Sequence, residues 1–483
     1  MPKVEMRDMV ILLPGIMGSV LQKDGRDLWA ISGQAMGAAL WSLGGAIEKL
    51  KLEEDDPEVD DLGDGIRATR LMPDAHIVPG LWTIDGYSAV SRYLENYFEL
   101  KRGSIDNETP ANFFEFPYDW RRDNRVAAQQ LKEFVDRRLQ LWQESRNVAD
   151  AKVILIAHSM GGLVARYYLE VYEGWQDCKA LITFGTPYRG SVKALNFLAN
   201  GYKKLFLDLT ELLSSFTSVY QLMPIYEMLD VNGEFKRVAE TDNVPGVIRG
   251  RAEQALCFHR EIEAAVNEHN DDASYQRLYK TIPVVGTHQP CLQSAKLSGG
   301  KLTASRSLPA WIDPLHDGGD GTVPRLSAIP IELSEASRET FLAEKHGSLQ
   351  NNRRVLADLG ERLKQMQTSD LSKIRAAEIS PMVEERPAIT LELDDLYLAD
   401  EPVKLRAKLI NMSESDGPPR ARIEPVDREV SPIEGAFETR KDEDGWVFTR
   451  EDLAPGLYRV KVWTRTAGPQ DPASVHDLFE VGR

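Results

Sequence analysis

A strand, a sharp turn and a helix follow one another in the middle of the chain, with a serine at the apex of the turn. The apolar run 153–156 predicts a buried strand, and helical spacing begins at Leu163. Between them, residues 157–162 read Ala-His-Ser-Met-Gly-Gly and place small residues on both sides of Ser159. Small neighbours let strand and helix approach closely, so the serine stands strained and exposed above a sheet. A serine needs such a position and a neighbouring base to become a nucleophile.

The turn departs from the usual pattern at one position. Ala157 stands where a glycine is typical, although alanine also avoids bulk. A turn without chemistry is the alternative interpretation of any single motif. The strand before it and the helix after it favour the catalytic interpretation.

Length and composition describe an ordinary globular protein. The 483 residues suffice for two or three domains, with 42% hydrophobic and 28% charged residues. The net charge of −17 argues against a nucleic-acid partner, because phosphate binding needs a basic face. Part of the negative charge lies in the acidic stretch 53–61, which we expect to be a solvated loop.

Cysteine usage and hydropathy bear on the compartment. The three cysteines are widely and irregularly spaced, which fits a reducing compartment better than a disulfide framework. The N-terminal residues lack the apolar core of a signal peptide, and no uninterrupted apolar stretch is long enough for a transmembrane helix. We therefore expect a cytoplasmic protein.

Alternating strand and helix patterns predict the fold class. Such alternation implies right-handed crossovers and a mostly parallel sheet flanked by helices, an α/β fold. The region from about 195 to 280 shows helical patterns without strands and predicts a cap over the sheet. The expected strands lie at 9–13, 113–116, 153–156, 180–184, 281–286 and 339–344, and a closing helix at 352–366.

The character of the chain changes after residue 368. Residues 369–386 are polar and interrupted by proline, which is typical of a linker. From 387 to 483, short runs alternate apolar and polar residues between turn signals, and they predict an immunoglobulin-like β-sandwich. The expected domains are thus 1–368 and 387–483.

The order of residues selects partners for the serine. In folds with this turn, the acid and then the histidine follow the serine in the chain. Of the eight histidines, only His346 and His476 follow the acid candidate Asp320, and His476 lies in the predicted β-sandwich. His346 is therefore the expected base and Asp320 the expected acid, with Asp317 as the alternative acid. Both aspartates lie in the glycine-rich loop 317–324, and the alternative interpretation is that they form turns or bind a structural cation. Their oxygen ligands are too few and too irregularly spaced for a standard calcium loop.

Two backbone amides are candidates for stabilising an oxyanion. One belongs to Met160, directly after the serine, and the other to Ile16 in the loop after the first strand. The alternative is that this glycine-containing loop serves only local geometry. The sequence indicates no metal and no cofactor.

Four segments and His346 form a longer pattern along the chain. The segments are 13–19 (Leu-Pro-Gly-Ile-Met-Gly-Ser), 117–121 (Pro-Tyr-Asp-Trp-Arg), 158–167 (His-Ser-Met-Gly-Gly-Leu-Val-Ala-Arg-Tyr) and 320–324 (Asp-Gly-Thr-Val-Pro). In this order they resemble the lecithin:cholesterol acyltransferase family, which includes lysosomal phospholipase A2 and phospholipid:diacylglycerol acyltransferase.

The resemblance implies an α/β-hydrolase core whose serine is acylated by a lipid ester and then deacylated by an alcohol or water. It implies Ser159 as nucleophile, Asp320 as acid, His346 as base, and the Ile16 and Met160 amides as the oxyanion hole. The chain departs from extracellular and lysosomal members in having no cysteine before Cys178, so their disulfide after the first loop is absent. The C-terminal β-sandwich is a further departure.

Two apolar segments are candidates for lipid contact. Residues 36–52 and 205–223 either form a tunnel and lid for an acyl chain, with transient contact to a membrane surface, or pack as ordinary cap helices. The expected function is a serine-dependent acyl-ester hydrolase or O-acyltransferase acting on lipid esters. The alternatives are a carboxylesterase for small esters, and a scaffold recruited to an unknown protein partner through its C-terminal domain.

Overall fold

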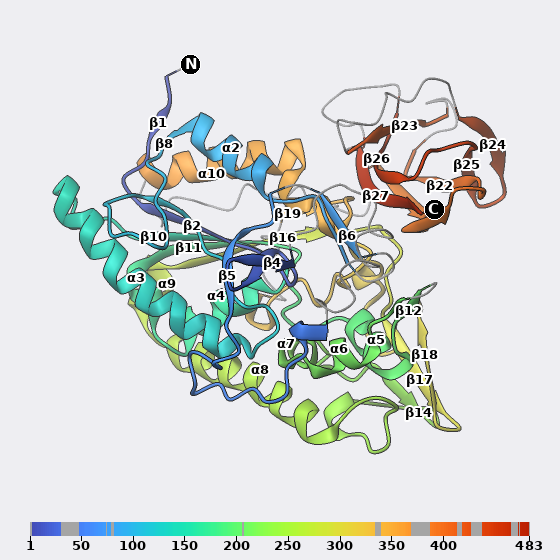
Figure 1. Ribbon diagram of the computed structural model, residues 1–483, viewed down its shortest axis with the longest axis horizontal. Helices are drawn as coiled ribbons and strands as arrows, with labels where there is room; N and C mark the ends of the chain where they lie inside the picture. The colour runs from blue at the N-terminus through green and yellow to red at the C-terminus, as the bar shows by residue number, and fades with distance from the viewer. Residues whose placement is uncertain are drawn as a thin grey trace.

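A six-stranded parallel sheet forms the centre of the molecule (Figure 1). The computed structural model describes residues 2–29, 48–73, 75–78, 82–204, 207–333, 340–368, 387–412, 418–426, 437–464, 472 and 474–482. In spatial order the strands are β19 (Thr340–Leu342), β16 (Lys280–Gly286), β11 (Cys178–Phe184), β10 (Val153–His158), β2 (Met9–Leu13) and β9 (Phe113–Glu115).

The strand order defines the class of fold. The chain enters at β2, adds β9 at one edge, and returns to β10 on the other side of β2. It then adds β11, β16 and β19 in sequence, all parallel. This order, with a serine directly after β10, is the α/β-hydrolase arrangement, and the predicted fold class is confirmed.

Helices cover both faces of the sheet because its strands are apolar on both sides. Alternate side chains of β2 and β10 pack with α3 (Asn124–Arg146) and α4 (Gly161–Glu170), while the residues between them pack with α2 (Ser88–Tyr97) and α10 (Arg353–Thr368). Figure 1 shows α2 and α10 on one side of the sheet and α3 on the other. The N-terminus of α3 is capped by Asp123, whose side chain accepts a bond from the Arg125 amide.

The insertion between β11 and β16 contains strands as well as helices. Its longest helix, α8 (Arg249–His269), packs against α4 and α7 (Thr217–Gln221). A hairpin, β14 (Leu229–Val231) and β15 (Glu234–Lys236), joins β17 (Ser294–Ser298) and β18 (Lys301–Ser305) in a four-stranded sheet. The prediction of a cap without strands is therefore wrong. The missed signal is the Asn232-Gly233 turn, where both residues have positive φ, as tight hairpins require. The other helices of the insertion are α5 (Val192–Asn200), α6 (Thr210–Ser215) and α9 (Ala273–Leu278).

Smaller elements surround the core. A three-stranded sheet follows the first loop, and the remaining strands form short pairs. The bounds are β3 (Ser19–Lys23), β4 (Arg26–Trp29) and β5 (Ile66–Leu71), then β1 (Val4–Glu5) with β8 (Phe98–Glu99), β6 (His76–Val78) with β7 (Trp82–Ile84), and β12 (Lys203–Lys204) with β13 (Leu207–Asp208).

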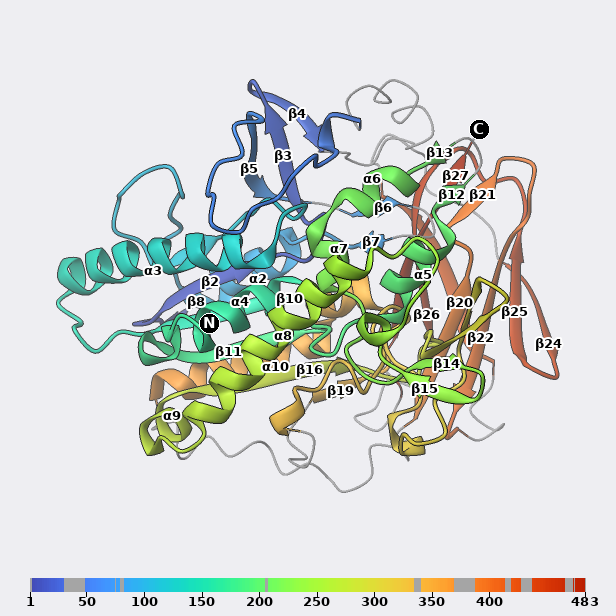
Figure 2. The ribbon, with the colours of Figure 1, turned by 90° about the horizontal axis from the view of Figure 1, so that it is seen from below.

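Two four-stranded sheets make up the C-terminal part and share one apolar cluster. Figures 1 and 2 both place these sheets at one end of the molecule, and β27 lies beside β6 and the segment that follows β19. One sheet has the order β20 (Ala388–Leu393), β22 (Val403–Ile410), β25 (Gly445–Arg450), β24 (Glu438–Asp442), and the other β21 (Leu396–Leu398), β27 (Val475–Gly482), β26 (Gly456–Trp463), β23 (Arg420–Pro425). The proposed linker 369–386 lies outside the described residues.

None of the described helices is long and apolar enough to span a lipid bilayer.

Candidate active site

Ser159 occupies a strained turn between β10 and α4. Its φ of 53° lies in the left-handed region, which is costly for a residue other than glycine. The turn is held from both sides, because the Ser159 amide donates to the Phe184 carbonyl at 2.9 Å and the Thr186 hydroxyl donates to the Ser159 carbonyl at 2.9 Å. A side chain at Gly162 would collide with Thr186. The predicted strand, turn and helix are confirmed, and the small residues are needed for this close packing.

The three predicted side chains lie in one hydrogen-bonded chain. His346 Nε2 is 2.9 Å from Ser159 Oγ, and His346 Nδ1 is 2.7 Å from Asp320 Oδ2. The residues come from the segments after β10, β16 and β19, whose carboxyl ends meet at one edge of the parallel sheet. All three are buried, with exposed fractions of 4% for Ser159, 4% for His346 and 1% for Asp320.

The Asp320 carboxylate is oriented by its own loop. Oδ1 accepts bonds from the amides of Thr322 at 2.9 Å and Val323 at 2.7 Å, which leaves Oδ2 to His346. The alternative acid, Asp317, binds Gln293 Nε2 through its Oδ1 at 2.6 Å. Of the two acids, the structure brings Asp320 to His346.

Gly185 permits the close approach of the acid and the histidine. It has a φ of +56°, and a Cβ there would lie 2.7 Å from Asp320 Oδ2 and 2.9 Å from His346 Nδ1. Any side chain at this position would enter the hydrogen bond between them.

The first loop packs directly on the turn that carries the serine. A Cβ at Gly15 would lie 2.8 Å from Ser159 Cβ, so no larger residue fits there. Within the described residues, neither the Ile16 amide nor the Met160 amide donates a hydrogen bond to the protein. Both amides are thus without a protein acceptor among these residues, and their role as an oxyanion hole stays a prediction.

The Tyr-Asp-Trp-Arg element supports this first loop. The Tyr118 hydroxyl donates to the Pro14 carbonyl at 2.9 Å, and Trp120 Nε1 donates to the Ser19 carbonyl at 2.9 Å. Arg121 is fully buried and pairs with Asp119 and Asp64. This motif of the resemblance therefore holds the loop that contains the Ile16 amide.

Tyr87 and His158 form a second buried hydrogen-bonded chain, which no local sequence pattern predicts. The Gly15 amide donates to the Tyr87 hydroxyl at 2.8 Å, and that hydroxyl lies 2.9 Å from His158 Nδ1. His158 Nε2 lies 3.1 Å from the carbonyl of His346, which can only accept, so Nε2 carries the proton and Nδ1 accepts from Tyr87. Burial, with a smaller effect of the nearby His346, lowers the pKa of His158 to about 3. This neutral histidine links the first loop to the loop of the base.

Acid is expected to destabilise the fold through His158. The unfolded chain takes up a proton at the ordinary pKa of 6.5, whereas the folded state resists protonation down to a pH of about 3. Stability from this residue is fully present above its unfolded pKa and falls by about 1.4 kcal/mol for each pH unit below it. In urea unfolding between about pH 6 and about pH 4, His158→Gln is expected to remove this part of the pH dependence.

His269→Gln is the matched control for this measurement. The hydrogen bond to Glu170 raises the pKa of His269, so its contribution changes only above the unfolded pKa. An unaltered pH dependence in His158→Gln would show that the ring is not held neutral.

The acidic stretch 53–61 is only partly the solvated loop that we expected. Asp55 pairs with Arg122 at 3.0 Å, and both side chains are 5% exposed. Arg122 also donates to the carbonyls of Val59 and Asp60. The buried Arg122 side chain thus holds the loop in place. The charge pattern of the stretch does not predict this contact, because the arginine lies more than 60 residues further along the chain.

The apolar segments predicted to contact lipid are described only in part. Residues 36–47 and 205–206 lie outside the described residues. The side chains of Leu209, Leu212, Leu213 and Phe216 are buried in the main apolar cluster. Those side chains belong to the apolar core, with the Phe216 ring against Trp120, as in ordinary cap helices.

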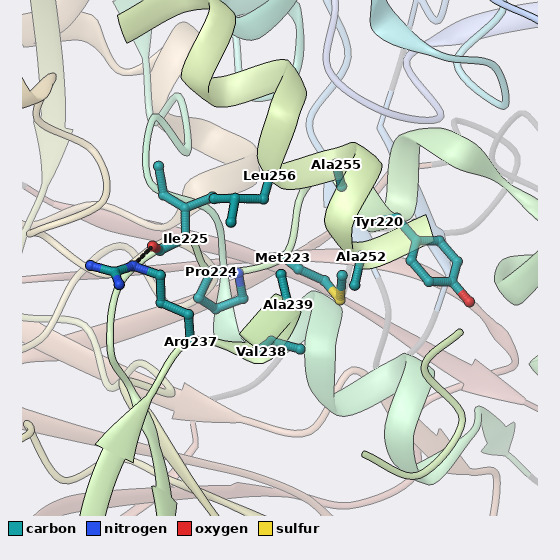
Figure 3. Close-up of a pocket in the computed structure, with 10 residues that line it drawn as sticks. All are labelled: Tyr220, Met223, Pro224, Ile225, Arg237, Val238, Ala239, Ala252, Ala255 and Leu256. Carbon is teal, nitrogen blue, oxygen red and sulfur yellow. Dashed lines mark hydrogen bonds between the residues drawn. The ribbon is translucent and has the colours of Figure 1, made fainter. Parts of the chain in front are cut away.

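A small pocket in the insertion is separate from this site (Figure 3). None of Ser159, Asp320 and His346 lines it, and an Arg237 side chain bonded to the Ile225 carbonyl at 3.1 Å stands at one side. Its lining residues are Tyr220, Met223, Pro224, Ile225, Arg237, Val238, Ala239, Ala252, Ala255 and Leu256. Within the described ranges, no cluster of three His, Cys, Asp or Glu residues is arranged to hold a metal ion.

The strand order is that of an α/β-hydrolase, and the three side chains have the arrangement of a candidate serine-hydrolase site. Residues 67–278 match the family model described as lecithin:cholesterol acyltransferase, which confirms the resemblance over that range. The matched range contains the serine turn and the Tyr-Asp-Trp-Arg element.

Two individual proteins are similar in sequence to part of this chain. The chain is 38% identical over 88 residues to phosphatidylcholine-sterol acyltransferase of Gallus gallus, covering 18% of this chain and 20% of that protein. It is 34% identical over 91 residues to lysosomal phospholipase A and acyltransferase of Homo sapiens, again 18% and 20%. The alignments thus span about a fifth of these relatives.

Two solved structures are also similar. The mature lipase BlEst2 of Bacillus licheniformis covers 74% of this chain and 91% of its own, at 12% identity and a TM-score of 0.32. Phospholipase PlaB from Legionella pneumophila covers 98% and 90%, at 10% identity and a TM-score of 0.19.

Proposed function

We propose that the protein is a serine hydrolase or O-acyltransferase that acts on lipid esters through an acyl-Ser159 intermediate. The observation that carries this proposal is the unbroken hydrogen-bonded chain from Asp320 through His346 to Ser159. Nucleophile, base and orienting acid stand in the arrangement that acyl transfer needs.

The proposed chemistry follows from the donors and acceptors present. His346 Nε2 takes the Ser159 proton while Oγ attacks the ester carbonyl carbon. The resulting oxyanion accepts bonds from the Ile16 and Met160 amides. Collapse of this intermediate releases the alcohol, which leaves with the proton from His346. Water or a second alcohol then attacks the acyl-serine by the same route in reverse.

The lipid class of the substrate rests on the family match. The matched relatives are named an acyltransferase of phosphatidylcholine and sterol, and a phospholipase A and acyltransferase. We propose the same class of substrate here, with an acyl chain held between apolar side chains of the insertion. We also propose that the insertion makes transient contact with a membrane surface.

Product analysis tests this proposal. The protein would be incubated with a labelled phospholipid, with and without a long-chain alcohol, and the products identified by mass spectrometry. We expect free fatty acid without the alcohol, and a new ester with it if the enzyme is a transferase. Turnover of short acetate esters alone would favour a carboxylesterase. If a fluorophosphonate probe also failed to label the wild type, the enzymatic proposal would be wrong.

We further propose a reducing compartment, the cytoplasm, as the place of action. All three cysteines, Cys178, Cys257 and Cys291, are free in the structure. Microscopy of a tagged full-length chain tests this placement, and a signal confined to lysosomes would contradict it.

A further inference from the structure

Glu344 joins the loop of the candidate base to the C-terminal sheets. Its carboxylate is fully buried two residues before His346. One oxygen accepts from the backbone amides of Lys345 at 3.0 Å and His476 at 2.8 Å. The other accepts from Asn352 Nδ2 at 2.8 Å and from His476 Nδ1, 3.1 Å away. Four donors thus fix this carboxylate, and two of them belong to a residue of β27.

Gln289 makes the corresponding connection beside the candidate acid. Its backbone exchanges two hydrogen bonds with Gly319, the residue before Asp320, at 2.9 and 3.2 Å. Its fully buried side chain donates to the Ile389 carbonyl at 2.9 Å and accepts from the Leu391 amide at 3.0 Å. The amide group therefore pairs with β20 as a neighbouring strand would, at the edge of the first C-terminal sheet.

These contacts lie at the loops that carry Asp320 and His346. The proposed chemistry depends on the distance between these two loops, because it sets the hydrogen bond between the acid and the base. The His346 amide also donates to the Asp320 carbonyl at 2.9 Å, so the two loops are bonded to each other. A salt bridge of 3.4 Å between Lys345 and Asp477 of β27 adds a further connection. Buried polar groups of this kind hold a fixed geometry, because each lost partner leaves an unsatisfied group.

We propose that the C-terminal sheets position the acid and the base of the active site, through Gln289 and through the Glu344–His476 pair. This inference rests on the proposed function of Ser159, Asp320 and His346. Gln289, Glu344 and His476 are positioning residues, since they act through the loops of Asp320 and His346. On this view, the C-terminal region takes part in catalysis, and recruitment of a partner is not needed to explain its presence.

Single substitutions in the full chain test the proposal. Gln289→Met keeps the length of the side chain and removes its polar atoms, while His476→Ala removes the Nδ1 donor at a partly exposed position. His476→Asn is the rescue variant, because its amide nitrogen takes the place of Nδ1. Glu392→Gln is the matched control. It removes the exposed Arg306–Glu392 salt bridge of 2.8 Å, which joins the same two parts of the protein without touching either loop.

The readouts are kcat and KM for a soluble ester, the rate of fluorophosphonate labelling, and the midpoint of thermal unfolding. We expect Gln289→Met and His476→Ala to lower kcat and the labelling rate about tenfold while KM changes less than about twofold. We expect Glu392→Gln to stay within about twofold of wild type and His476→Asn to recover most of the loss.

The outcomes separate this inference from the function on which it rests. Wild-type kcat and labelling in both Gln289→Met and His476→Ala, with or without a lower unfolding midpoint, would overturn the inference and leave the proposed function standing. An equal loss in Glu392→Gln would also overturn it, because the loss of any contact between the C-terminal sheets and the rest of the protein would then explain the effect. Absence of turnover and labelling in the wild type would overturn the proposed function and this inference with it.

Discussion

Replacing Ser159 with alanine is expected to lower kcat by about 10⁶-fold while leaving the fold intact. The change removes Oγ, the atom that lies 2.9 Å from His346 Nε2, and alanine meets the same backbone strain as serine at the φ of 53°. Ester turnover and urea unfolding would be measured on the same preparation. Ser145→Ala is the matched control, because that hydroxyl only bonds the Trp142 carbonyl within α3. Activity of Ser159→Ala above about a hundredth of wild type would mean that another group is the nucleophile.

Replacing Asp320 with asparagine is expected to lower kcat by about 10⁴-fold with little change in KM. The asparagine oxygen can still accept from the amides of Thr322 and Val323, so the side-chain nitrogen must face His346. That nitrogen donates to Nδ1, which forces the proton of the neutral ring onto Nε2. Nε2 then cannot take the proton of Ser159.

Asp317→Asn is the control for the acid, since Asp317 was the alternative acid in the sequence. Its carboxylate contacts Gln293 at 2.6 Å, and we expect its substitution to leave kcat within about threefold of wild type. A loss in Asp317→Asn as large as that in Asp320→Asn would contradict the assignment. Steady-state kinetics of both variants with the same soluble ester makes the comparison.

The sequence was sufficient for those parts of the site that depend on local pattern and chain order. The turn at Ser159 follows from small residues between a strand and a helix, and such a turn needs no distant partner to be recognised. With Asp320 as the acid candidate, the order of serine, acid and histidine selected His346, and the structure places His346 between Asp320 and Ser159. Their catalytic roles stay predictions until the substitutions are made.

Contacts between distant segments could not be predicted in the same way. Tyr87 and His158 are 71 residues apart, and Gln289 and Leu391 are 102 apart. Nothing in the local sequence of a tyrosine or a glutamine reports such a partner. The hairpin at β14 and β15 was missed for another reason: its strands have three residues each, too few for an alternating pattern to be visible. The boundaries at 368 and 387 also stay predictions, because the segment between them lies outside the described residues.

Peptide mapping by mass spectrometry after fluorophosphonate labelling tests the central claim most directly. The wild type is expected to carry one phosphonyl group, located on Ser159, and prior incubation with excess phospholipid is expected to slow its attachment. A label on any residue other than Ser159, or a wild type that takes up no label, would contradict the claim that Ser159 is the acylated nucleophile.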